Sequence, residues 1–234
     1  MQTIPFQKTD TRVIVNDFIR SVYNWMGIGL GLTGFIAYYV AHNQAMKELV
    51  YGNKLMFFGL FIAELALVFT LSSRINRMSA SAATGFFLLY SILNGATLSF
   101  IFLVYTSASI SSTFLICSAT FVACSAYGMI TKRDLTSFGG FISMGLIGIV
   151  IASLVNLFLK SPAVYMAVSY IGVFIFVGLT AYDTQKLKHM ALTQPAELDS
   201  GAVRKGAILG ALSLYLDFIN LFLMLLRILG SSRD

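Results

Sequence analysis

Long apolar blocks, separated by short polar stretches, run along most of the sequence. Between Met78 and Thr131, for example, there is no Asp, Glu, Lys or Arg. A helix needs about 20 apolar residues to cross a bilayer core of roughly 30 Å, and this rule predicts seven spanning helices. They cover about 22–41, 55–73, 82–105, 112–131, 137–159, 163–185 and 206–229. The blocks lack the alternation of barrel strands, so the pattern predicts an all-α integral membrane protein.

The predicted organisation is a single seven-helix transmembrane domain over 22–230. A polar to amphipathic segment, 1–21, precedes it, and a short tail, 231–234, follows it. The connections are short except for roughly 186–205, between the last two spans. Because the 112–131 block is rich in Ser, Thr and Cys, a six-span topology with a re-entrant segment there is the alternative.

The composition agrees with a membrane protein and excludes several other classes. Charged residues make up 11% of the chain and hydrophobic residues 57%, whereas a soluble domain carries about 25% charged residues. This excludes an ordinary soluble enzyme, a disordered protein and a disulfide-rich scaffold. The net charge of +6 does not indicate nucleic acid, because the basic residues stand singly or in pairs between apolar blocks. Cys117 and Cys124 share a helix face within one such block, which favours packed thiols over a disulfide or metal site.

The Lys and Arg residues divide unevenly between the two sides of the predicted bundle. Eleven of the sixteen fall on one side, namely Lys8, Arg12, Arg20, Arg74, Arg77, Lys132, Arg133, Lys186, Lys188, Arg204 and Lys205. The other five are Lys47, Lys54, Lys160, Arg227 and Arg233. Cytoplasmic loops carry the excess of Lys and Arg, so we expect a cytoplasmic N-terminus and, after seven spans, a C-terminus outside.

Three acidic residues, Glu64, Asp183 and Asp217, lie inside predicted spans. An ionised carboxylate at the bilayer centre costs about 2.5–3.5 kcal/mol on insertion scales, so such residues normally face a partner or a cavity. Asp217 lies near the middle of the last span, with Ser213 and Asn220 on the same helix face. A structural role, such as capping a helix or bonding across a helix interface, is the alternative for each acid.

Asp183 and Asp217 would form a proton-sensitive pair if they meet. Both cannot comfortably ionise in a medium of low dielectric constant, so the pair would gain and lose protons as a coupled unit. Arg74, at the cytoplasmic end of the second span, could pair with Asp183. Without the shared proton, the doubly negative site would attract a hard cation such as Ca²⁺, which prefers oxygen ligands. Counting at 1.5 Å per residue puts Asp183 about 5 Å and Asp217 about 16 Å from the cytoplasmic edge. For the two aspartates to meet, helix tilt or a later start of the last helix must remove this difference in depth.

The segments around the two aspartates are distinctive. The first reads Ala181-Tyr182-Asp183-Thr184-Gln185, and the second reads Ser213-Leu214-Tyr215-Leu216-Asp217-Phe218-Ile219-Asn220-Leu221-Phe222. Both resemble the signature of the Bax inhibitor family, the transmembrane Bax inhibitor motif proteins. The turn at 132–135 and the segment 226–230 are similar too, so the resemblance covers roughly 20–230.

The resemblance implies a seven-helix bundle with the last helix central. It also implies, as in bacterial members, an aspartate pair that senses pH and controls a Ca²⁺ leak. Those roles fall on Asp183 and Asp217 as sensor and gate and on Arg74 as the latch, with Arg77 one turn further on as the alternative. Glu64 resembles an acid that the family shows early in its second helix. The 33 residues between the two aspartates exceed the spacing of some bacterial relatives.

Together these observations favour a pH-sensitive calcium (cation) leak channel in a bacterial inner membrane. Asp183 and Asp217 would bind Ca²⁺ transiently, and the residues expected along the cation path are Glu64, Ser213 and Asn220. The expected partners are calcium ions, protons, the lipid bilayer and possible membrane proteins, with no nucleic acid. No resident cofactor is expected, because calcium is the transported ion.

Two other functions fit parts of the sequence. Family association suggests a non-catalytic membrane regulator that binds proteases or death-pathway partners. Two aspartates on late helices would also suit an intramembrane aspartyl protease. However, Asp217 does not follow a Gly-x-Gly run, and no Pro-Ala-Leu comes after it. We therefore do not expect an enzyme.

Overall fold

The structure is a computed structural model that describes residues 6–193 and 199–233, with side chains from residue 15 onward in the first range. Within these ranges the chain is almost entirely helical and forms two compact units. Unit 1 comprises the chain up to Val104 together with Lys188–Tyr215. Unit 2 comprises Tyr105–Leu187 together with the chain from Leu216. The predicted segment 1–21 and tail 231–234 lie partly outside the described residues, and a single domain over 22–230 stays a prediction.

Unit 1 contains the N-terminal helices. They are α1 (Phe6–His42), α2 (Gln44–Tyr51), α3 (Lys54–Arg74), the 3₁₀ turn η1 (Ile75–Arg77), α4 (Ala80–Leu98) and α5 (Phe100–Val104), joined by the first part of α9 (Ser200–Leu229). Asn43, Asn53 and Ser79 cap α2, α3 and α4, because each side chain accepts a hydrogen bond from a backbone N–H of the first turn. The short polar stretches of the sequence therefore end one helix and start the next.

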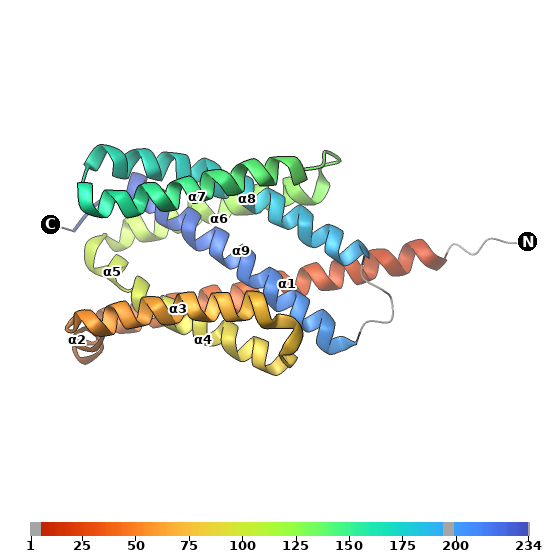
Figure 1. The fold of residues 1–234 in the computed structure, drawn as a ribbon, viewed down its shortest axis with the longest axis horizontal. Coiled ribbons are helices and arrows are strands. Elements are labelled where there is room, and N and C mark those ends of the chain that lie inside the picture. The colour runs from red at the N-terminus through yellow and green to blue at the C-terminus, as the bar shows by residue number, and fades with distance from the viewer. Residues whose placement is uncertain (1–5, 194–198, 234) are drawn as a thin grey trace, which may run out of the picture. The chain divides into compact units, whose positions relative to one another are not determined.

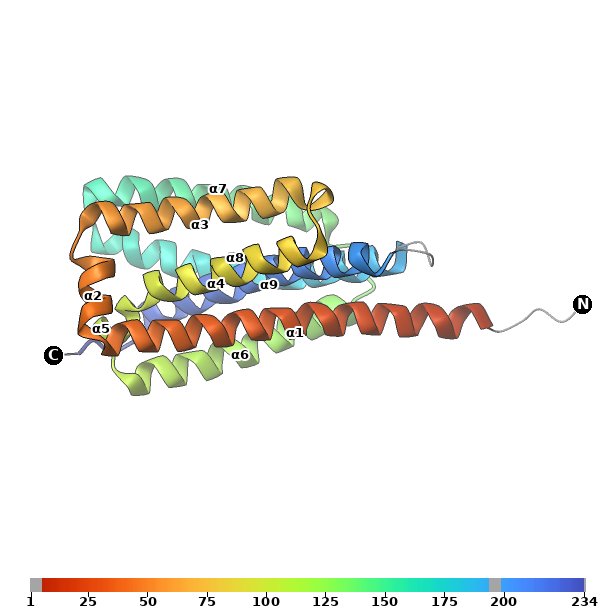
Figure 2. The ribbon, with the colours of Figure 1, turned by 90° about the horizontal axis from the view of Figure 1, so that it is seen from below.

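Helices α1 and α4 pack closely inside unit 1 (Figure 2). A Cβ atom added to Gly95 would lie 2.6 Å from the Thr33 carbonyl oxygen, so only glycine permits this approach. Phe87 packs against Gly29 in the same way. The first part of α9 also contacts α1, since the Arg204 guanidinium lies 5.3 Å from the centroid of the Trp25 ring.

Unit 2 contains α6 (Ser107–Ile130), α7 (Thr136–Leu159), most of α8 (Pro162–Thr193) and the second part of α9 (Figure 1). Phe218 of α9 makes edge-to-face contacts with Phe114 and Phe121 of α6, at centroid distances of 5.6 and 5.4 Å. The Cys117 thiol donates to the Phe218 carbonyl oxygen at 3.7 Å, and both cysteines are free. Cys117 is therefore a packing residue as predicted, whereas Cys124 is half-buried.

The chain after α9 returns to the start of α6 in unit 2. Ser232 forms an isolated antiparallel bridge with Tyr105, and the Thr106 N–H donates to the Ser231 carbonyl oxygen at 3.1 Å. These contacts fix the described part of the C-terminal segment.

Six helical segments of the described chain are long and apolar enough to cross a membrane. They are Lys54–Arg77, Ala80–Val104, Ser107–Ile130, Thr136–Leu159, Pro162–Thr193 and Ser200–Leu229. They coincide with six of the seven predicted spans. The first predicted span, 22–41, lies inside α1, a continuous helix of 37 residues that is not among the six. The predicted count of seven and the central position of the last helix are not confirmed.

The predicted long connection at 186–205 is wrong. Helix α8 continues to Thr193 and α9 begins at Ser200, so most of that segment is helical. A later start of the last helix is excluded as well, because α9 begins six residues earlier than predicted. The 112–131 block lies in α6, which is unbroken to Ile130, so no re-entrant turn interrupts it.

Candidate functional site

The segment 181–185 lies on α8 in unit 2, and its last residue secures the turn between α6 and α7. The Gln185 side chain donates to the Arg133 carbonyl oxygen and accepts from the Leu135 N–H, both at 2.8 Å. Since Gln185 satisfies one donor and one acceptor of this turn, it ties the turn to α8.

Three more residues of this segment pack against α6 and α7. A Cβ on Gly128 would overlap the Ala181 carbonyl oxygen, and a Cβ on Gly139 would overlap the Tyr182 ring. The Thr184 hydroxyl donates to the Ser125 hydroxyl at 3.4 Å. Four of the five residues therefore hold α6, α7 and α8 together.

Asp183 and Asp217 are brought together in unit 2. The two carboxyl groups are within electrostatic reach of each other, because the charge of Asp183 acts on Asp217. Asp217 is only 5% exposed, and among the described residues its Oδ2 atom has no hydrogen-bond partner. Asp183 is partly exposed, and Lys186, one turn further along α8, is the cation that acts on it. Sequence reasoning counted Lys186 only as a topological charge.

The structure lengthens both helices and leaves the predicted difference in depth between the aspartates almost unchanged. Asp217 lies 17 residues after the start of α9, or about 26 Å at 1.5 Å per residue. Helix α8 extends ten residues beyond Asp183, which places that residue about 15 Å from the C-terminal end of the helix. The predicted span 163–185 implied that Asp183 is near the end of its helix. This is wrong, because α8 continues to Thr193.

Ser213 and Asn220, predicted to line the cation path, are both half-buried on α9. The Asn220 side-chain nitrogen donates to the Leu216 carbonyl oxygen of its own helix at 2.8 Å. Its side-chain oxygen is thus the atom that remains for a ligand. Ser213 belongs to unit 1 and Asn220 to unit 2, so their shared role stays a prediction.

The two candidate latch residues are both exposed members of unit 1. Arg74 is the last residue of α3, and Arg77 ends the 3₁₀ turn η1. Because the aspartates belong to unit 2, a contact with either arginine stays a prediction.

Glu64 belongs to a separate polar network inside unit 1. It is 6% exposed and accepts hydrogen bonds from the Asn94 amide, at 3.3 Å, and from the Thr97 hydroxyl. The Tyr215 hydroxyl donates to the Asn94 side-chain oxygen at 3.1 Å and lies 2.6 Å from the Thr33 hydroxyl. The network therefore joins α3, α4, α9 and α1 through buried polar side chains.

Sequence reasoning missed this network. The available signal was the pair Asn94 and Thr97, which lie three residues apart within the charge-free block and so share a helix face. It could not identify Glu64, which lies 30 residues before Asn94 on another helix, as the common partner.

The donor set sets a limit on how a metal ion could bind. Within 15–193 and 199–233, no group of three or more His, Cys, Asp or Glu side chains is arranged to hold a metal ion. Ca²⁺ takes six to eight oxygen ligands. Two aspartates supply only part of that shell, so the arrangement suits an ion that keeps water or backbone oxygens and is held weakly.

Comparison with known proteins identifies relatives of similar length. Residues 15–234 match the family described as inhibitor of apoptosis-promoting Bax1. The chain is 56% identical over 222 residues to the inner membrane protein YbhL of Escherichia coli K12, covering 95% of this chain and 94% of that one. An uncharacterized protein of Borreliella burgdorferi is 42% identical over 97% of both chains. An uncharacterized membrane protein of Streptococcus pyogenes serotype M1 is 39% identical over 95% of this chain and 96% of its own. With its apolar helices and its two aspartate segments, the chain belongs to the Bax inhibitor family of membrane proteins.

Proposed function

We propose that this protein is a pH-sensitive calcium (cation) leak channel in which Asp183 and Asp217 are the proton sensor and the gate. The observation that carries the proposal is the buried Asp217 carboxyl, which has an unpartnered oxygen and a second carboxyl near it. Burying such a group within apolar helices is costly unless a proton or a cation compensates it. A site that must hold either a proton or a cation is suited to make cation passage depend on pH.

Protons and cations compete for the pair in this mechanism. A proton shared by Asp183 and Asp217 removes the repulsion between them and stabilises one arrangement of α8 and α9. Loss of the proton leaves two negative charges, which a passing Ca²⁺ compensates with its own charge. Lys186 offsets part of the charge on Asp183, so Asp217 is the carboxylate that depends most on the ion.

The remaining assignments extend the same proposal. Arg74 closes the site as a latch, whereas Glu64, Ser213 and Asn220 contribute oxygen atoms along the cation path. The protein resides in a bacterial inner membrane, as the name of its Escherichia coli relative indicates for that protein. The N-terminus is cytoplasmic and the C-terminus is outside. No step of the mechanism is enzymatic.

Calcium flux into liposomes tests the proposal. The full chain is reconstituted with a calcium-sensitive dye inside the vesicles, and flux is measured in acidic, neutral and alkaline buffer. Wild-type flux is expected to depend on pH. Asp217→Asn cannot ionise, so its flux should fall about tenfold, as the loss of about 1.4 kcal/mol of ion binding implies, and should no longer respond to pH. Asp183→Asn should show a smaller loss, because that residue is more exposed and lies near Lys186.

The matched control is Glu48→Gln, which neutralises an exposed acid on α2. It should leave both the flux and its pH dependence unchanged. If both aspartate variants behave like the control, the aspartate pair is neither sensor nor gate and the proposal is wrong.

A further inference from the structure

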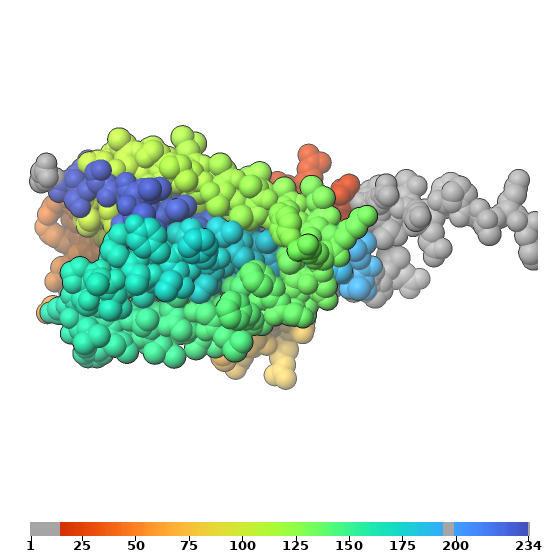
Figure 3. All heavy atoms as spheres, turned by 90° about the horizontal axis from the view of Figure 1, so that it is seen from above, coloured from red at the N-terminus to blue at the C-terminus, as the bar shows by residue number. Residues whose placement is uncertain are grey.

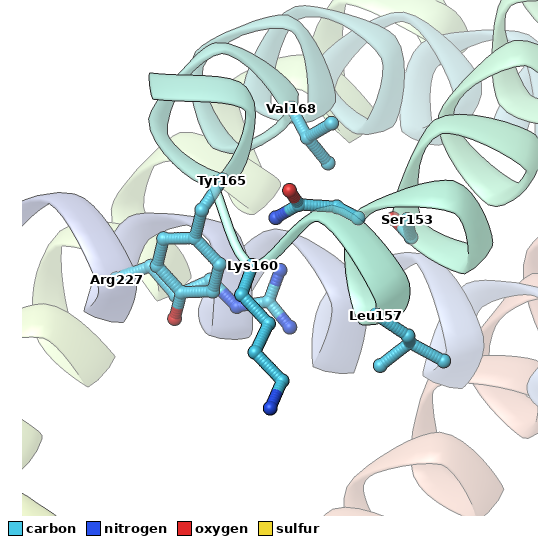
Figure 4. Close-up of a pocket in the computed structure, with 7 residues that line it drawn as sticks. Ser153, Leu157, Lys160, Tyr165, Val168 and Arg227 are labelled. Carbon is cyan, nitrogen blue, oxygen red and sulfur yellow. The ribbon is translucent and has the colours of Figure 1, made fainter. Parts of the chain in front are cut away.

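A cavity of about 410 Å³ lies in unit 2, where α7 ends and α8 begins. Figure 4 shows the Tyr165 ring, the Arg227 guanidinium and the Lys160 side chain grouped beside the end of α7. Asn156 and Ser153 line the same cavity from the last turns of α7. Neither aspartate contributes to this lining, so the cavity is distinct from the proposed ion pathway.

The lining carries positive charge without a compensating acid. Lys160 and Arg227 are its two charged residues, and no Asp or Glu side chain is among the described residues that line it. The Arg227 guanidinium lies 4.9 Å from the centroid of the Tyr165 ring. Such stacking uses the flat face of the guanidinium and leaves its N–H edge for an oxyanion. The cavity therefore selects an anionic group.

The backbone places the Lys160 side chain at this position. Lys160 directly follows the last residue of α7 and caps the helix in the left-handed region, at φ 50°. Its N–H donates to the Asn156 carbonyl oxygen at 2.8 Å. The Ser161 N–H donates to the Asn156 side-chain oxygen at 2.9 Å. This leaves the Asn156 side-chain N–H₂ as a neutral donor beside two cations.

A neighbouring tyrosine adds no negative charge. The Tyr105 hydroxyl interacts with that of Tyr165, and Arg227 also acts on it. Burial, together with Tyr165, raises the pKa of Tyr105, so its phenol stays neutral at physiological pH. Arg227 is thus not neutralised by a phenolate.

The surface beside the cavity is strongly apolar. Leu157 is 68% exposed and Phe158 is 87% exposed, both on α7, which is one of the candidate spans. Figure 3 shows α7 and α8 as a continuous surface of green to cyan spheres. If α7 spans the membrane, a cationic cavity at its end is at the level of the lipid headgroups and their phosphates.

We propose that this cavity binds the headgroup of an anionic phospholipid. Its phosphate contacts Lys160 and Arg227, the Asn156 amide donates to a headgroup oxygen, and an acyl chain follows the exposed side chains of α7. The site is independent of calcium passage, so it stands whether or not the aspartate pair is the gate.

Lipid retention by the full chain tests this proposal. The protein is purified in detergent with phosphatidylglycerol or phosphatidylcholine, and bound lipid is counted by native mass spectrometry. Phosphatidylglycerol should be retained preferentially. Each cation near an anionic lipid contributes about fivefold to binding, so Lys160→Gln and Arg227→Gln should each lower its retention by about that factor. Lys54→Gln, which removes an exposed cation at the start of α3, is the matched control and should retain it.

Three outcomes would overturn the proposal. Equal retention of the two lipids would show that charge does not select the ligand. Unchanged retention in Lys160→Gln, whose exposed side chain can be replaced without disturbing the fold, would exclude this cavity. Inorganic phosphate that displaces phosphatidylglycerol at comparable concentration would identify a site for a free anion rather than for a lipid.

Discussion

The Thr97 hydroxyl has one hydrogen and two acceptors within reach. One acceptor is the Glu64 carboxylate on α3, and the other is the Leu93 carbonyl oxygen of its own helix, at 3.0 Å. A charged Glu64 takes this hydrogen, whereas a protonated Glu64 donates its own to Thr97 and releases the Thr97 hydrogen to Leu93. The contact is therefore satisfied in either protonation state of Glu64.

Asn94→Ala should lower the thermal stability of the purified protein. It removes a donor to Glu64 and an acceptor for Tyr215 at once, and buried polar groups left unsatisfied cost about 1–3 kcal/mol. Asn220→Ala is the control, because that side-chain nitrogen donates only to its own helix. The measurement is thermal unfolding in detergent. If Asn94→Ala costs as much in a Glu64→Ala background as in the wild type, the two side chains are not coupled and the network is wrongly assigned.

At this scale the sequence is informative about which residues are unusual but not about their partners. Glu64, Asp183 and Asp217 can be identified from one chain, because each adds its own cost of insertion into a membrane. The partners of Glu64 come from α4, and the partner of Asp183 comes from α9. Such pairings depend on how helices are rotated and tilted, and the spacing of residues along the chain does not determine either.

Helix positions are predicted more accurately than helix ends. Helices α3 and α7 match the predicted spans to within one residue at each end, because polar residues or a tight turn limit them. Helix α8 ends eight residues later than predicted, and helix α9 begins six residues earlier than predicted. The rule of 20 apolar residues measures bilayer thickness, whereas the stretch after Asp183 is polar but has good helix formers such as Lys, Leu, Met and Ala.

The contact of α6 with α8 depends on Gly128. A methyl group there would overlap the Ala181 backbone oxygen, so Gly128→Ala must push the two helices apart. Overpacking of this kind lowers the free energy of unfolding by about 1–3 kcal/mol. The better helix propensity of Ala than of Gly offsets about 1 kcal/mol of that loss. We expect a lower thermal unfolding temperature and an altered calcium flux, because Asp183 lies two residues beyond Ala181.

Gly140→Ala is the matched control for this prediction. A Cβ at Gly140 of α7 meets no atom within 4 Å, so the substitution should leave stability unchanged or raise it. Equal unfolding temperatures for the two variants would contradict the close contact at Gly128.

On the scale of the whole molecule, the membrane topology depends on α1. With seven spans, the uneven distribution of Lys and Arg predicts a cytoplasmic N-terminus and a C-terminus outside. The side of the N-terminus depends on α1 alone. Its segment 22–41 is long enough to cross, but it contains Asn24 and several Tyr and Gly residues, which make it less apolar than the other six.

Reporter fusions in bacterial cells distinguish seven spans from six. Alkaline phosphatase fused after the last residue should be active, because that enzyme folds outside the cytoplasm. Green fluorescent protein fused before Met1 should fluoresce, since it does so only in the cytoplasm, and α1 must then cross the membrane. Fluorescent protein inserted in the turn after Lys132 is the control and should fluoresce under either topology.

A dark N-terminal fusion beside an active C-terminal one would show that α1 does not cross, leaving six spans and Arg20 outside. The eleven cytoplasmic basic residues would then fall to eight, because Lys8, Arg12 and Arg20 would change sides, leaving eight on each side. That even division removes the charge bias that orients membrane proteins, which is the physical reason to expect that α1 crosses.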